Sequence, residues 1–239
     1  MDISKLIDAY TARARLLPGL LTVLPLATSV YAWDPGNQLG WNGLGALIIG
    51  AGGTVLLSFI ARDLGRRVEP KLFSRWGGRP TEVMLMHSGS MDPVLRKRRH
   101  AAIRKLYPDI ALPTAADEAH DRAAAYGRWT PIIRLLISRT RDHAKFPMVF
   151  EENCNYGFRR NMHGMRVVGL AISLTTTIAL GLQIYILFSM HQRLAVLSLL
   201  LELVNVVMLA VWILWATDNS VRRGATLYAE RLLETLDKA

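Results

Sequence analysis

The sequence predicts a mainly α-helical membrane protein, with four transmembrane helices in two hairpins and a helical basic cytoplasmic domain between spans 2 and 3. The 239-residue chain is 51% hydrophobic, has a positive mean hydropathy, and carries 29 Lys and Arg against 19 Asp and Glu. Strong hydrophobicity and strong positive charge fit a chain in which apolar and basic residues occupy separate segments. The single cysteine, Cys154, allows no disulfide within the chain and suits a reducing compartment.

Four apolar segments approach the roughly 20 residues that a helix needs to cross a bilayer. They are residues 16–33, 41–61, 167–188 and 194–216, and only the fourth contains a side chain that is normally ionised at neutral pH, Glu202. Pro25 is expected to kink or loosen the first helix. An alternative for this segment is a signal peptide, with Arg13 and Arg15 before the apolar run and a cleavage site that ends at Ala32. Cleavage would leave the topology of the other three spans unchanged.

Charge predicts the orientation of these spans. Residues 62–164 hold 20 basic and 11 acidic residues, whereas loop 34–40 has no Lys or Arg and loop 189–193 has one. The positive-inside rule therefore puts both termini and the long segment in the cytoplasm of a bacterial inner membrane. The expected parts are a first hairpin with its N-terminal segment (1–61), a basic domain (62–165), a second hairpin (166–217) and a cytoplasmic C-terminal helix (218–239).

Small residues form stripes on two of the spans. They recur at four-residue steps in the third span and at three- and four-residue steps in the second (Gly169, Ser173, Thr177 and Gly181; Gly43, Ala46, Gly50 and Gly53). Small side chains let transmembrane helices approach closely. The stripes fit packing inside one four-helix protomer or packing between subunits of a homo-oligomer.

The fourth span carries a polar face made of Ser198, Glu202 and Asn205. A carboxyl group near mid-membrane is costly unless it faces protein or water, so these three residues are candidates for the lining of a pore or ion path. Two alternatives stay open. Glu202 could be protonated and bonded to Gln183 or to its own copy across an interface, or it could serve proton-coupled transport.

The 62–165 segment is expected to be helical except for one short strand. The second span is expected to extend through Trp76 and end at Gly77, and a strand is expected over 81–86. A helix capped by Asp92 then runs to about Tyr107, and a helix capped by Thr114 ends near Gly127. Thr130 and Pro131 open the next helix, and Pro147 opens a last one that runs through Phe158 toward the third span.

The densest charge lies on the helix that Asp92 caps. It comprises Arg96, Lys97, Arg98, Arg99, Arg104 and Lys105. Such a run suits either anionic lipid and plain solvation or a phosphate-rich ligand bound through its backbone. Aromatic residues are not interleaved with it, so base recognition has weak support. In the ligand model, Arg159 and Arg160 complete the site, and the linkers at Arg66-Arg67 and Arg159-Arg160 carry its state to the spans.

The sequence gives little sign of catalysis. It contains no glycine-rich phosphate loop, no metalloprotease or nucleophile-elbow motif, and no Cys or His pair at metal spacing. The six histidines are scattered. We therefore expect a protein that is not an enzyme and that uses no metal or cofactor.

Part of the basic segment resembles a family of uncharacterised bacterial four-span membrane proteins. The residues that carry the resemblance fall within 80–165, and the most specific are Tyr156-Gly157-Phe158-Arg159-Arg160-Asn161. The architecture also resembles the Hailong-type membrane effectors of anti-phage defence. In those systems DNA oligomers made by a partner nucleotidyltransferase hold a channel shut. The resemblance implies an oligomeric channel gated by a nucleotide or oligonucleotide, in contact with membrane lipids.

We therefore expect an oligomeric inner-membrane channel or pore-forming effector whose basic domain binds a polyanion. The rival from another class is a membrane-anchored interaction protein whose basic domain docks a partner or anionic lipid and conducts nothing. A transporter is disfavoured because the four spans contain no inverted repeat.

Overall fold

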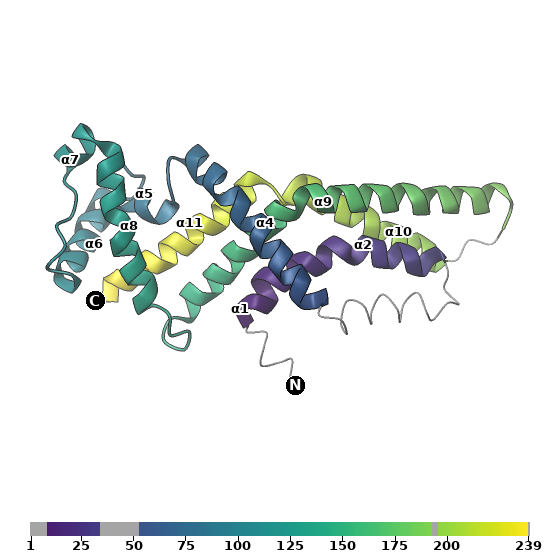
Figure 1. The fold of residues 1–239 in the computed structure, drawn as a ribbon, viewed down its shortest axis with the longest axis horizontal. Helices are drawn as coiled ribbons and strands as arrows, with labels where there is room; N and C mark the ends of the chain where they lie inside the picture. The colour runs from purple at the N-terminus through teal and green to yellow at the C-terminus, as the bar shows by residue number, and fades with distance from the viewer. Residues whose placement is uncertain (1–8, 34–52, 193–195, 239) are drawn as a thin grey trace. The chain divides into compact units, whose positions relative to one another are not determined.

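The computed structural model describes residues 9–33, 53–192 and 196–238 (Figure 1). Within these ranges all regular structure is helical, which confirms the predicted class. The elements are α1 (Ala9–Thr11), η2 (Ala12–Leu16), α2 (Leu17–Trp33), α4 (Gly53–Trp76), α5 (Pro80–Leu85), α6 (Pro93–Leu106), α7 (Ala115–His120), α8 (Arg122–Arg139), α9 (Pro147–Ser189), α10 (Val196–Ala210), η3 (Val211–Trp215), α11 (Asp218–Glu234) and η4 (Thr235–Lys238). Segments η2 and η3 are π-helical, and η4 is a 3₁₀-helix.

The chain divides into two compact units. The span unit comprises Met1–Glu69 and Gly157–Val221, and the basic unit comprises Pro70–Tyr156 and Arg222–Ala239. The basic unit holds 19 Lys and Arg against 12 Asp and Glu. Its core includes residues of the C-terminal segment, which was predicted to be a separate helix. Helices α4, α9 and α11 each begin in one unit and end in the other.

Three helices in the described ranges are long and apolar enough to cross a membrane. They are Ala9–Ala32, Pro147–Ser189 and Val196–Trp215. Predicted spans 16–33, 167–188 and 194–216 fall largely within them. Most of predicted span 41–61 lies outside the described residues, together with loop 34–40 and the stripe residues Gly43, Ala46 and Gly50. The four-span arrangement therefore stays a prediction.

The core of the span unit gathers around the indole of Trp212 in η3, which is fully buried. Helices α2 and α10 pack side by side, and the buried core residues come from α4, α9, α10 and η3, with Ala216 just beyond η3 (Figure 1). They are Ala61, Met162, Met165, Met208, Trp212 and Ala216. Many apolar side chains of α9 and α10 stay exposed on their outer faces. An apolar outer surface of this kind suits a hydrocarbon environment.

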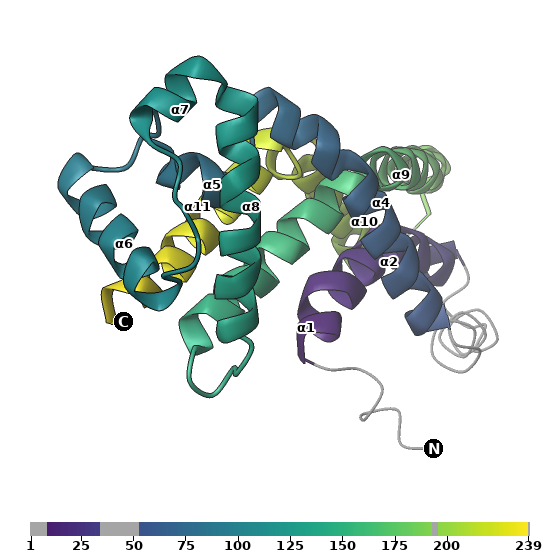
Figure 2. The ribbon, with the colours of Figure 1, turned by 60° about the vertical axis from the view of Figure 1, so that its left-hand side comes forward.

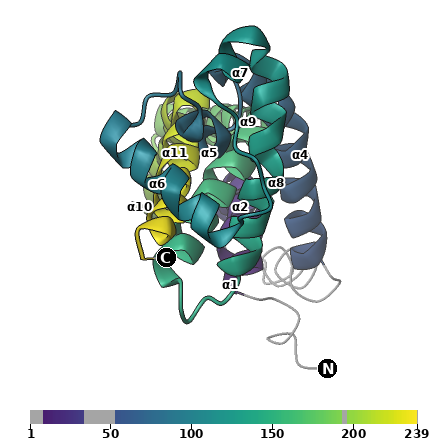
Figure 3. The same cartoon turned by 90° about the vertical axis from the view of Figure 1, so that its left-hand side faces the viewer.

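The basic unit has its own core around Trp129 of α8. Buried residues from α5, α6, α8, the start of α9, α11 and η4 join it (Figure 2), among them Leu85, Ile103, Ile132, Leu136, Val149, Leu232, Leu233 and Leu236. Segment η4 packs against α6, so the C-terminus lies beside that helix (Figure 3). These six helical segments enclose the core of the basic unit, and its described residues contain no β-sheet.

Several predicted helix ends are confirmed. The Asp92 side chain accepts hydrogen bonds from the backbone N–H groups of Val94 and Leu95, and α6 begins at Pro93. Thr114 and Asp117 form a reciprocal capping box at the start of α7. Helix α4 ends before Gly77, whose φ of 77° is in the left-handed region that favours glycine. Helix α9 begins at Pro147 and continues to Ser189.

Two predicted elements are wrong. Residues 81–86 form no strand, because Pro80 starts helix α5 and the buried residues Thr81, Glu82 and Leu85 follow helical spacing. No helix ends near Gly127 either. Helix α7 ends at His120, and α8 runs without a break from Arg122 through Gly127 and Pro131 to Arg139. Gly127 lies on the exposed face, where water can bond the carbonyl group that Pro131 leaves unpaired.

Candidate functional site

A short stretch of α9 concentrates the side-chain hydrogen bonds of the span unit. Successive residues on a helix point about 100° apart, so neighbouring side chains reach different helices around α9. We call the residues that do so the collar residues. They are Arg159, Arg160, Asn161, His163 and Arg166.

Asn161 binds the first π-helical segment. It is fully buried, and its Nδ2 donates to the Ala14 carbonyl oxygen at 2.6 Å within η2. Helix α4 passes so close that a Cβ on Gly65 would lie 2.0 Å from the Asn161 Oδ1 atom. A glycine at position 65 is therefore required for the contact, and the amide joins three segments of the chain.

Arg160 links α9 to α4 by an ion pair. Its Nη1 lies 2.9 Å from the Glu69 Oε1 atom, and its Nε donates to Asn161 Oδ1 at 3.1 Å. Arg160 is buried, with 8% of its surface exposed. A buried guanidinium needs such acceptors to offset its desolvation.

The second π-helical segment is bound by the other end of the collar. The Arg166 guanidinium donates to the carbonyl oxygens of Trp212 at 3.0 Å and Ile213 at 3.1 Å, both in η3. His163 Nδ1 lies 3.0 Å from the carbonyl oxygen of Ala216, so Nδ1 carries the proton. Because a π-helical turn leaves α-helical carbonyl positions without their usual partner, these side chains stabilise an irregular backbone.

Arg159 extends the collar to the start of α11. Its guanidinium donates to Ser220 Oγ at 3.1 Å and lies 5.2 Å from the centre of the Trp215 ring. A cation over an indole face is favourable. The pairing fixes the chain where η3 leads into α11.

The small-residue stripe of the third span faces α10 and η3 of the same chain. A Cβ on Gly169 would lie 2.3 Å from the Trp212 ring, and one on Gly181 would lie 3.6 Å from Glu202 Oε1. Ser173, between them on the stripe, is fully buried. In this structure the stripe therefore packs against helices of the same chain, as the interpretation of packing within one protomer expects.

Asn205 lies inside the protein between α10 and α2. It is fully buried, its Nδ2 donates to Ser29 Oγ at 3.0 Å, and the Thr28 hydroxyl lies 2.8 Å from its Oδ1 atom. These hydrogen bonds join two apolar helices through buried polar side chains. The other two residues of the predicted polar face, Ser198 and Glu202, are partly exposed.

Three side-chain oxygen atoms, one on α10 and two on the small-residue stripe of α9, have no hydrogen-bond partner in the described part of the chain. Glu202 Oε2, Ser173 Oγ and Thr177 Oγ1 are all buried and unpaired there. Buried polar atoms are normally paired with protein or water, so this seam between α9 and α10 has unused bonding capacity.

The predicted basic run divides into an inward and an outward set. Arg99 is buried and contacts Asp237 at 3.4 Å, and Arg96 donates to the carbonyl oxygens of Met86 and Gly89, both at 3.1 Å. The other four side chains are exposed and follow one face of α6, with Arg98 also 3.8 Å from Asp237. These four, which we call the α6 basic face, are Lys97, Arg98, Arg104 and Lys105.

His100 lies beneath this face in the core of the basic unit. Burial lowers its pKa from the usual value of 6.5, and the neighbouring His87, Arg104 and Arg96 lower it further, while a hydrogen bond to the Leu85 carbonyl opposes them. Its ring contacts those of His87 and Trp129. His100 is therefore a neutral core residue at pH 7.

Sequence reasoning found some of these residues and missed the roles of others. The structure brings Arg159 and Arg160 together with Asn161, but their partners are internal. It does not group them with Arg96–Arg99, which belong to the other unit. No local sequence pattern indicates the role of His163 or marks η2 and η3 as π-helical. The signal available was the dense mixture of polar residues and glycines directly before an apolar span.

No cluster of three or more His, Cys, Asp or Glu side chains suited to a metal ion occurs within residues 9–33, 53–192 and 196–238. Comparison of the chain with protein-family models, with curated proteins and with solved structures gave no match.

Proposed function

We propose that the chain is an oligomeric channel or pore-forming effector of the bacterial inner membrane, opened or closed by a polyanionic ligand on the α6 basic face. A nucleotide or an oligonucleotide has the required chemistry. The resemblance described above suggests a role in anti-phage defence, with a partner nucleotidyltransferase as the source of the ligand.

The orientation follows from charge. Arg62, Arg66 and Arg67 lie on α4, and Arg159, Arg160 and Arg166 lie on α9, at the polar ends of the apolar segments. The positive-inside rule favours the cytoplasm for these ends, and therefore for the basic unit and both termini.

The α6 basic face supports a phosphate-rich ligand. Four cationic side chains project from about two and a half helical turns. Three of them, Lys97, Arg104 and Lys105, form no salt bridge within the described residues. Their charges remain available to anions. Phosphates bound by such side chains release condensed counterions, which makes binding strongly dependent on salt.

The observation that carries the proposal is the continuity of α9. This helix of 43 residues starts in the basic unit, bears the collar, and ends as an apolar span. A change in the basic unit that moves α9 also acts on every collar bond. Because two collar residues, Asn161 and Arg166, bond to π-helical segments, the collar is a candidate for an element with two arrangements, which gating requires.

Ligand binding is tested with full-length protein in detergent and a fluorescent oligothymidylate. Changing Lys97, Arg98, Arg104 and Lys105 to Ala should weaken binding at least tenfold. The slope of log affinity against log salt should fall by about 3, because each phosphate contact to a single strand contributes about 0.7. The matched control removes four other exposed charges of the basic unit, Arg122, Arg134, Arg139 and Arg141.

Equal losses in both variants would mean non-specific attraction, and absence of oligomer binding would overturn the ligand. Anionic vesicles without oligomer test lipid docking separately. Oligomer or vesicle binding without current in a reconstituted bilayer would favour the rival function, a membrane-anchored interaction protein.

Conduction is tested at Glu202, with Ser198 and Asn205 as the other proposed pore or pore-supporting residues. Glu202→Gln keeps the shape of the side chain and removes its charge, so reversal potentials under a salt gradient should lose cation preference while assembly persists. Unchanged reversal potentials would remove Glu202 from the conduction path.

A further inference from the structure

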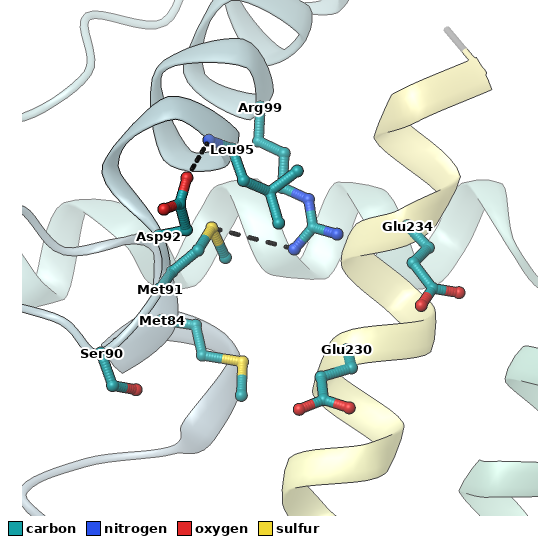
Figure 4. A pocket seen from close by; sticks show the side chains of 8 residues that line it. All are labelled: Met84, Ser90, Met91, Asp92, Leu95, Arg99, Glu230 and Glu234. Atoms are coloured by element: carbon teal, nitrogen blue, oxygen red, sulfur yellow. Dashed lines mark hydrogen bonds between the residues drawn. The ribbon is translucent and has the colours of Figure 1, made fainter.

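A cavity of about 300 Å³ opens between α6 and α11 in the basic unit (Figure 4). Leu95 and Arg99 of α6 line one side, and Glu230 and Glu234 of α11 line the other. Met84 and Met91 complete an apolar wall. Cavities of this size are at the lower end of the range for small-molecule sites, which are typically mostly apolar with a few placed charges.

The opposite charges that line this cavity do not meet. Arg99 pairs with Asp237 at 3.4 Å, and Glu234 is bound by Arg231 at 2.8 and 2.9 Å. No salt bridge among the described residues joins Arg99 to either glutamate of α11. Glu230 is exposed on its helix and accepts no hydrogen bond from the described side chains. The cavity therefore presents separated positive and negative groups.

Arg99 has bonding capacity that the protein leaves unused. Only 5% of the residue is exposed, and its Nε atom is buried without a hydrogen-bond partner in the described chain. Nη1 contacts the Met91 sulfur at 3.8 Å, which is a weak acceptor. Figure 4 shows the guanidinium between Met91 and Glu234, at the cavity. Nη1 therefore keeps N–H capacity that a carboxylate oxygen in the cavity would accept better than the thioether does.

We propose that the cavity binds a small zwitterion, an α-amino acid with an apolar side chain. Its carboxylate bonds to Arg99, its ammonium group bonds to Glu230, and its side chain packs on Met84, Met91 and Leu95. A purely anionic ligand would meet repulsion from Asp92, Glu230 and Glu234, which all line the cavity, and a purely cationic one would leave Arg99 Nη1 with only the Met91 sulfur. Only a ligand with both charges satisfies both walls.

This site is distinct from the α6 basic face. Arg99 points into the unit, whereas Lys97, Arg98, Arg104 and Lys105 are exposed. The inference does not depend on the proposed channel function, because binding is measured on purified protein without any current.

The test is calorimetric titration of the full-length protein in detergent with L-leucine. Saturable binding is expected. Isoamylamine, which lacks the carboxylate, and 4-methylpentanoate, which lacks the ammonium group, should each bind at least about tenfold more weakly, the loss expected for one charge-assisted hydrogen bond.

Two substitutions test which residues bind the carboxylate and the ammonium group of the ligand. Glu230→Gln, at an exposed position, and Arg99→Gln should each weaken L-leucine binding about tenfold or more. Arg98→Gln is the matched control, since Arg98 contacts the same Asp237 but does not line the cavity. Absence of saturable binding at millimolar L-leucine would overturn the site. Equal binding of either analogue, or an equal loss in Arg98→Gln, would overturn the zwitterion assignment. If Arg99→Gln does not fold, Glu230→Gln and the two analogues still decide.

Discussion

The collar arginines of α9 and the exposed arginines of α6 use the same side chain for different purposes. On α9, Arg160 and Arg166 are bound to a carboxylate and to backbone carbonyl groups inside the span unit. On α6, Arg104 extends from the surface of the basic unit. The difference teaches that charge density in a sequence does not by itself locate a ligand site, because guanidinium groups also stabilise irregular backbone.

The largest expected effect tests the close packing that the collar needs. Gly65→Ala puts a Cβ into Asn161, so we expect a loss of about 3 kcal/mol in stability, typical of severe overpacking. Gly127→Ala is the control, because a Cβ there meets no atom within 4 Å and alanine favours a helix by about 0.5–1 kcal/mol. The readout is the midpoint of thermal unfolding in detergent. Similar midpoints in the two variants would contradict the close approach at Gly65.

The next effect compares the two kinds of arginine directly. Arg160→Ala removes partners from Glu69 and Asn161, and we expect it to cost about 2 kcal/mol, since Glu69 is partly hydrated. Arg104→Ala should change stability by less than about 0.5 kcal/mol, as is usual for an exposed residue. It should nevertheless weaken oligothymidylate binding. If Arg104→Ala destabilises the protein as much as Arg160→Ala, the division into inward and outward arginines fails.

A third prediction concerns pH and the core of the basic unit. Because burial lowers the pKa of His100 in the folded state, the unfolded state binds protons first as pH falls below 6.5. Stability from this group is complete above pH 6.5 and is lost as pH falls toward the lowered folded pKa. His87, Arg96 and Arg104 face the ring and act in the same direction. The midpoint temperature of thermal unfolding should therefore decrease as the pH is lowered from 7.5 to 5.5.

The matched variant for this pH effect is His100→Gln, whose amide can still donate to the Leu85 carbonyl. Its midpoint should depend less on pH over the same interval. Equal pH dependence in the two proteins would assign the acid sensitivity to other groups.

The smallest expected effect compares two adjacent threonines of α9. The Thr176 hydroxyl lies 2.9 Å from the Ile172 carbonyl oxygen, whereas Thr177 Oγ1 is buried without a partner in the described chain. If the seam is dry, Thr177→Val should be neutral or stabilising by up to about 1 kcal/mol, because it removes an unpaired polar atom. Thr176→Val should be mildly destabilising. A larger loss in Thr177→Val would indicate bound water or an ion at the seam.

Local signals predicted much of the fold. Asp92 with Pro93, Thr114 with Asp117, and Gly77 marked helix ends correctly because each acts on its own backbone neighbours. The signals failed where tertiary packing decides. Pro131 did not start a helix, because Asp121 had already capped α8 and the face of Gly127 is open to water.

The candidate site was harder to predict than the fold. The sequence identified Arg159 and Arg160 but not their partners, since Glu69 and Ser220 are distant in the chain. It treated Arg96–Arg99 as one run, because a helix turns each successive residue by about 100° and only the packed structure reveals which side faces the core. Glu230 lies far along the chain from Arg99, so the cavity had no local signature.

The π-helical segment η3 also has a consequence for the evolution of chain length. Deleting one residue between Val211 and Trp215 could restore regular α-helical bonding. It would also turn everything before the deletion by about 100° relative to everything after it. Asn205 could then no longer face Thr28 and Ser29 while Arg166 held the carbonyls of η3. Single-residue insertions and deletions should therefore be selected against in this stretch, whereas exchanges among its five apolar side chains leave the register of the helix unchanged.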